Sequence, residues 1–96
     1  MTKATLYRDR NSFLADRVAG SFWIGDPDDD GIQSFLFFCP CGCEVKSVLR
    51  IGNGFKPKLG PSWCWNGSTT APELSPSVNW VGHWHGWLQD GEWRSC

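Results

Sequence analysis

Short apolar runs alternate with glycine, proline and acidic turns from residue 21 onward, a rhythm typical of a small β domain. Most of these runs have strand length, and breakers interrupt them every few residues. We predict strands over the following ranges: Ser21–Gly25, Gln33–Cys39, Val45–Ile51, Ser62–Asn66, Ser77–Val81, His83–Gln89 and Glu92–Arg94. Before the last of them stands an Asp-Gly pair between two apolar runs, which is a strong hairpin signal.

One helix is predicted ahead of the strands. Asn11 can cap a segment that Gly20 ends. The apolar residues Phe13, Leu14 and Val18 share one face of that segment. The pattern therefore predicts an α+β fold, a small and mainly antiparallel β domain with one short N-terminal helix.

The length of the chain places it near the lower limit for a stable core. With 96 residues, of which 41% are hydrophobic, we expect a single domain over residues 1–96. The helix occupies about residues 11–20 and the β core about residues 21–95. Because so small a core is marginal, a covalent or metal staple is expected.

The net charge and the distribution of apolar residues limit the cellular compartments and the classes of partner that we expect. The net charge is −1 and the nine basic residues are scattered, so no stripe for a nucleic-acid backbone exists. We find neither a secretory signal nor an apolar run long enough for a membrane span. We therefore expect no nucleic acid or membrane partner and a cytoplasmic location, in a bacterium or a phage-infected cell. Thiols stay reduced there, so clustered cysteines indicate a metal or catalysis rather than disulfides.

The CPCGC segment places three cysteines, Cys39, Cys41 and Cys43, on every second position. In an extended strand their side chains would stand about 6.5–7 Å apart, too far for one metal ion. Pro40 and Gly42 break the extension and allow a tight turn that gathers the sulfurs. Three thiolates leave a tetrahedral site incomplete, so we expect a further ligand from elsewhere.

The partner is expected in His83-Trp84-His85, which holds both histidines of the chain. Histidines two apart on a strand share a face, where they can ligate one metal or divide the roles of ligand and base. A mixture of cysteine and histidine favours Zn²⁺. The alternative is a set of reduced core cysteines with a surface histidine pair. Cys64 and Cys96 lack such neighbours and are interpreted as packing or tail residues.

Two hydroxyls occur on a proline-stiffened segment just before the histidine strand, at Ser75 and Ser77. A serine close to an imidazole can form a nucleophile–base pair. A Ser-Pro-Ser loop without any chemical role is the alternative.

Seven tryptophans are a large excess for 96 residues. Large rings fill the core of a small sheet and cover its faces, and we expect most of them to do so. One or two are expected to line a cleft.

Four segments together resemble the BubE-type family, small bacterial and phage proteins of which some are encoded beside ubiquitin-like conjugation genes. In chain order the segments are FLFFCPCGCE, SWCWNGS, PELSPSV and HWHGWLQDGEW, and they cover about residues 35–93. The resemblance implies a zinc-bearing β domain and a serine peptidase-like activity that cuts a ubiquitin-like protein from its target.

Carried onto this chain, the resemblance makes Cys39, Cys41 and Cys43 metal-site residues. It implies Ser77, ahead of Ser75, as the nucleophile and His85 as the base. Many relatives have a cysteine a few residues before the histidine that corresponds to His85. This chain has none, and we expect His83 to be the fourth metal ligand instead.

The leading hypothesis is a zinc-containing hydrolase in which Ser77 attacks an amide or ester carbonyl and His85 takes its proton. Asp90 is the expected third member that orients the imidazole. Zinc would staple the cysteine turn to the histidine strand, or in a variant would keep an open position and activate water. The alternative is a non-enzymatic zinc-binding module that holds a protein partner in a tryptophan-rich cleft.

Overall fold

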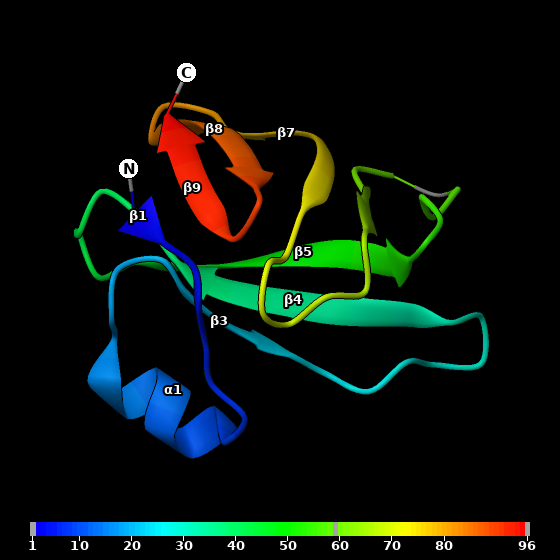
Figure 1. Ribbon diagram of the computed structural model, residues 1–96, viewed down its shortest axis with the longest axis horizontal. Helices are drawn as coiled ribbons and strands as arrows, with labels where there is room; N and C mark the ends of the chain where they lie inside the picture. Colours follow the sequence, from blue (N-terminus) through cyan, green and yellow to red (C-terminus); the bar gives the residue numbers. More distant parts are fainter. Residues whose placement is uncertain (1, 59, 96) are drawn as a thin grey trace.

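The computed structural model describes residues 2–58 and 60–95, and within them one short helix stands outside a strongly curved sheet (Figure 1). The fold is mostly β rather than α+β, because the helix has only seven residues whereas nine strands form one sheet. The strands are β1 (Thr2–Lys3), β2 (Thr5–Leu6), β3 (Ser21–Ile24), β4 (Ile32–Phe38), β5 (Lys46–Asn53), β6 (Trp63–Trp65), β7 (Leu74–Trp80), β8 (Trp84–Gln89) and β9 (Glu92–Ser95).

The strand order makes the sheet a nearly closed barrel. The order is β1-β9-β8-β7-β6-β5-β4-β3-β2, so the two edge strands are consecutive in the chain, one residue apart. Most neighbours pair antiparallel, as the sequence predicts, but β2 with β3 and β5 with β6 pair parallel. Curling the sheet until its edges almost meet buries one face and leaves few open edges.

The helix α1 spans Arg10–Asp16, one turn less at its end than the predicted range 11–20. The carboxylate of Asp9 caps it by accepting hydrogen bonds from the N–H and the hydroxyl of Ser12. Arg17 ends it in the left-handed conformation, with φ of 49°. The Asp9 carboxylate satisfies one of the free N–H groups of the first turn, so the cap is Asp9 rather than Asn11.

The helix is attached to the sheet through one buried ring. Phe13 is fully buried and packs against Phe38 of β4, with ring centroids 4.8 Å apart. Tyr7 contacts the Phe13 ring edge-on and donates a hydrogen bond to Asp16 at 2.9 Å. This small cluster lies on the outer face of β4, separate from the main core.

The main core is aromatic and is centred on Trp93 of β9. Its ring contacts Phe35, Phe37 and Trp84, and its indole N–H donates to the Gly20 carbonyl at 2.9 Å. Three tryptophans are buried in this cluster, Trp65, Trp84 and Trp93, in agreement with the expectation that large rings fill the core. Burying such rings supplies much of the driving force for a chain this short.

The Ser-Pro-Ser segment is part of a strand, where the sequence predicts a loop before a strand at Ser77–Val81. It lies in β7 where the pairing with β8 shifts register between Leu74 and Val78, and the peptide bond between Ser75 and Pro76 is cis. No helix within residues 2–58 and 60–95 has both the length and the apolarity to cross a membrane.

Candidate metal centre and serine–histidine pair

The cysteine segment forms a tight turn directly after β4. The Gly42 N–H donates to the Cys39 carbonyl at 3.2 Å, and the Cys41 N–H points to the Cys39 sulfur at 3.5 Å. Gly42 has φ of 88°, a conformation that glycine adopts without a steric penalty. Cys39 also donates its own N–H to the Val45 carbonyl, which closes the turn onto β5. The turn thereby gathers sulfurs that an extended strand would separate.

His83 lies in the hairpin turn between β7 and β8. Its N–H donates to the Trp80 carbonyl at 2.9 Å, and the two rings pack against each other at a tilt of 32°, with centroids 4.3 Å apart. This contact directs the His83 Nε2 to 2.9 Å from the Cys43 sulfur and 3.8 Å from the Cys41 sulfur. Two turns far apart in the sequence therefore meet at one point.

Four side chains, Cys39, Cys41, Cys43 and His83, form a cluster that can hold a metal ion. Their ligand atoms all lie within 4.8 Å of one another. A tetrahedral zinc site would space two sulfurs about 3.8 Å apart and a sulfur and a nitrogen about 3.5 Å apart. The Cys39 and Cys41 sulfurs are 3.0 Å apart, so small adjustments would open the cluster to that geometry. The expected ligand set is thus positioned to bind a metal ion.

Two thiols of the cluster differ in acidity. Burial, together with the hydrogen bond to Cys41, raises the pKa of the Cys39 thiol to about 12. The hydrogen bonds that Cys41 receives from Cys39 and Cys43 lower the pKa of Cys41. Because a metal takes cysteine as thiolate, binding would displace at least the proton of Cys39 at neutral pH.

The second feature is a serine–histidine contact on the strands that lead to and from His83. The Ser77 hydroxyl of β7 lies 3.3 Å from the His85 Nε2 of β8. His85 is exposed on the outer face of the sheet, and Ser77 is half-buried. The ring of Trp87 lies 6.1 Å from that of His85, measured between centroids. The hydroxyl and the imidazole are therefore within hydrogen-bonding reach of each other.

Asp90 does not lie near this pair. It occupies the turn between β8 and β9 with φ of 51°, and its N–H donates to the Glu73 carboxylate at 3.1 Å. It lies five positions after His85, a distance of roughly 16 Å along an extended chain. Among the described residues no hydrogen bond or ion pair joins Asp90 to His85. The hypothesis that Asp90 orients the imidazole does not fit this geometry.

A comparison with models of known protein families shows the family of this chain. Residues 8–96 match the family model described as bacterial ubiquitination-like system serine protease (BubE). This chain belongs to the BubE family. No curated protein and no solved structure matches it. The matched region contains the helix, the metal cluster and the serine–histidine pair, so the resemblance seen in the motifs is confirmed.

Two tryptophans of this BubE protein contact residues of the site. The sequence analysis did not predict these contacts. The Trp80 ring packs against the His83 ring, and the Trp63 indole donates to the Ser77 carbonyl at 3.1 Å. Their proximity to the motif residues in the chain was the only available signal. Cys64 is half-buried on β6 and stands outside the metal cluster, and Cys96 lies outside the described residues.

Proposed function

We propose that this BubE protein is a zinc-containing serine hydrolase that cuts a ubiquitin-like protein, or a related amide or ester, from its target. The observation that carries the proposal is the 3.3 Å contact between the Ser77 hydroxyl and the His85 Nε2. It occurs in a chain whose family is described as a serine protease of a ubiquitination-like system. A hydroxyl next to an imidazole is the arrangement that activates serine for acyl transfer.

The chemistry follows from these two side chains. Ser77 Oγ attacks the carbonyl carbon while the His85 Nε2 accepts the hydroxyl proton. The tetrahedral adduct then collapses, its C–N bond breaks, and His85 gives the proton to the departing amine. Water hydrolyses the resulting acyl-serine ester with His85 acting as base again. The exposure of His85 leaves the pair accessible to a protein-sized substrate.

Zinc suits the donor set better than other ions. Three thiolates and one imidazole are ligands that Zn²⁺ binds in tetrahedral sites, whereas Mg²⁺ and Ca²⁺ take oxygen ligands. Four protein ligands complete a tetrahedron, which favours a structural role over a water-activating one. Thiolate ligation also fits a reducing cytoplasm, in a bacterium or a phage-infected cell.

The proposal is tested with a serine-directed fluorophosphonate probe. We expect labelling of the wild-type protein and of Ser75→Ala, and loss of labelling in Ser77→Ala. Ser75 is the matched control because it lies two residues away on the same strand and is more exposed. Cleavage of a ubiquitin-like fusion should follow the same pattern. Neither labelling nor cleavage by the wild type would overturn the hydrolase and favour the non-enzymatic zinc module.

A further inference from the structure

The sheet contains a slot between β5 and β7. The short strand β6 lies between them, and it pairs with β5 only at Ile51–Asn53 and with β7 only at Leu74 and Ser75. Within the described residues no strand lies between the remaining parts, residues 46–50 of β5 and 76–80 of β7. Figure 1 shows β7 turning away from β5 toward β8. We call this interval the slot.

One wall of the slot is an open strand edge. The N–H of Cys39 donates to the Val45 carbonyl, and the β4–β5 register continues from this pair without a bulge. Hydrogen-bonded positions alternate in an antiparallel ladder, so Ser47 and Leu49 direct their peptide groups to β4. Lys46 and Val48 direct theirs into the slot, where the described residues supply no strand to pair with them.

The strand β6 and the cysteine–histidine cluster mark the two ends of the slot. At one end the single strand β6 occupies it. At the other end the cysteine turn after β4 and the His83 turn before β8 meet at the metal cluster. Five residues of β5 line the slot in between, a length of roughly 16 Å. The contact of His83 with Cys43 thus joins the two walls at this end, where no backbone pairing does.

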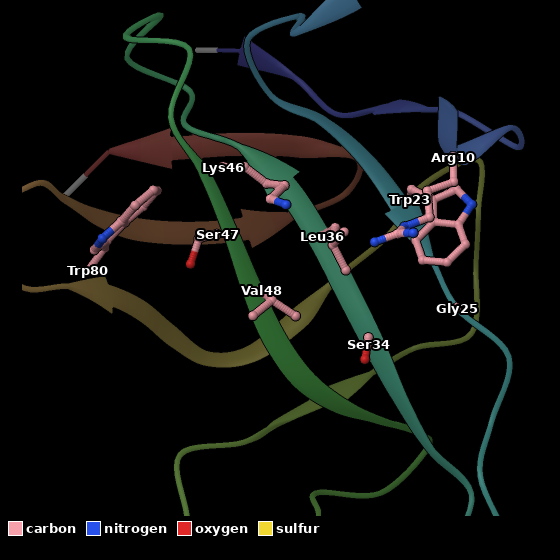
Figure 2. A pocket seen from close by; sticks show the side chains of 9 residues that line it. All are labelled: Arg10, Trp23, Gly25, Ser34, Leu36, Lys46, Ser47, Val48 and Trp80. Carbon is pink, nitrogen blue, oxygen red and sulfur yellow. The ribbon is translucent and has the colours of Figure 1, made fainter. Parts of the chain in front are cut away.

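A groove continues from the slot over the outer face of β4 and β3. Its volume is about 740 Å³, and its lining includes Trp80, Lys46 and Val48 at the slot and Arg10 and Trp23 at the far end (Figure 2). Val48 is 60% exposed, and the Arg10 guanidinium lies over the Trp23 ring at 5.6 Å. Two cations and no acidic side chain stand among the described residues of this lining.

The two sides of the slot differ in character. Lys46 pairs with Phe38, whose ring packs on the helix, so both side chains lie on the outer face. Trp63 and Trp80 pack against the main core, and Trp80 also borders the groove. A strand placed here would therefore alternate acidic residues toward Lys46 with apolar residues toward the tryptophans.

We propose that an extended acidic segment of a protein substrate adds as a strand to the β5 edge at Lys46 and Val48. Main-chain hydrogen bonds to an open edge supply affinity, and the alternating side chains supply specificity. The bound strand would lie beside β7 and bring a peptide carbonyl close to Ser77. Only this last consequence rests on the proposed function, since the binding itself does not need a reactive serine.

The probe is a seven-residue acetylated and amidated peptide of alternating glutamate and valine, titrated into the zinc-loaded Ser77→Ala protein. We expect saturable binding by calorimetry, with hydrogen exchange of the Lys46 and Val48 amides slowed at least about fivefold. N-methylation of alternate peptide bonds should weaken binding at least about tenfold, because it removes the edge hydrogen bonds. Equal binding of the methylated peptide, or unchanged exchange at both amides, would overturn the proposal.

Charge reversal tests the acidic preference. Lys46→Glu should weaken the peptide about fivefold or more, whereas Lys58→Glu, an exposed lysine outside the groove, should leave it unchanged. Tighter binding of a lysine–valine peptide to the wild type would overturn the assignment of an acidic segment. Because binding is measured without Ser77, an inactive wild type with intact peptide binding would refute the hydrolase alone.

Discussion

The imidazole Nε2 of His83 lies 2.9 Å from the sulfur of Cys43, although 40 residues separate the two in the chain. This contact joins the turn after β4 to the turn before β8. The strand β6 connects these two parts of the sheet only at its opposite end. A metal ion at the cluster would therefore fix the relative position of two hairpins that backbone hydrogen bonds leave apart.

Removal of the metal is predicted to destabilise the fold markedly. A ligand at a hundred times its dissociation constant contributes about 2.7 kcal/mol to the free energy of unfolding. For a domain of this size that corresponds to a melting temperature higher by about 10–20 °C. Chelation of the purified protein should lower the melting temperature by this amount, and His83→Ala should do the same without chelator.

Elemental analysis provides the control for that experiment. Protein purified without added metal should contain about one zinc per chain, and Ser77→Ala should keep it, because Ser77 is no ligand. A content below about a tenth of a zinc ion per chain, together with thiols that react freely with a thiol reagent, would refute the metal site.

The metal affinity is predicted to rise with pH. Burial raises the pKa of Cys39 to about 12, so this thiol stays protonated throughout the range from about pH 6 to 8. The metal binds the thiolate, so each binding event releases the Cys39 proton, and higher pH favours the complex. This residue alone should increase the apparent affinity about tenfold per pH unit.

Competition with a chromophoric chelator, corrected for the chelator's own protonation, measures how the apparent metal affinity changes with pH. Cys64→Ser is the matched control, because its thiol stands outside the cluster and the slope should persist. An affinity independent of pH would show that Cys39 is not a ligand.

The roles of His85 and Asp90 are separable by substitution. His85→Ala should slow fluorophosphonate labelling of Ser77 by about a hundredfold or more, the usual contribution of a general base. Asp90→Asn should change it less than about twofold, because Asp90 lies at the far end of β8 and asparagine tolerates its positive φ. Rates are followed by mass spectrometry of the labelled protein. Comparable losses in both variants would contradict this division of roles.

Sequence reasoning recovered the parts of this protein that local chemistry determines. The CPCGC turn was predictable because proline and glycine permit the bend that gathers the thiols. The residue pattern offered two histidines as partners, and the comparison with the family selected His83. The apolar runs predicted seven of the nine strands, with shifted boundaries.

Long-range packing decided what the sequence did not reveal. The strands β1 and β2 have two residues each, too short for a periodic signal, and they exist because they pair with β9 and β3. Asp90 was predicted to orient the imidazole as a third member, but the extended strand β8 separates it from His85. The family resemblance, rather than residue spacing, selected Ser77 over Ser75.

The last prediction concerns Gly86, which lies between His85 and Trp87 on β8 and faces inward. A Cβ at this position would collide with the Arg94 carbonyl and would stand 2.8 Å from the Trp84 ring. Because a backbone carbonyl in a paired strand cannot yield easily, Gly86→Ala should cost about 1–3 kcal/mol in the free energy of unfolding. Urea denaturation of the zinc-loaded protein measures this. Gly25→Ala is the control, since its Cβ would meet the Trp23 ring at an ordinary 3.4 Å. If both variants unfold at the same urea concentration, close packing between β8 and β9 does not constrain the strand that carries His85.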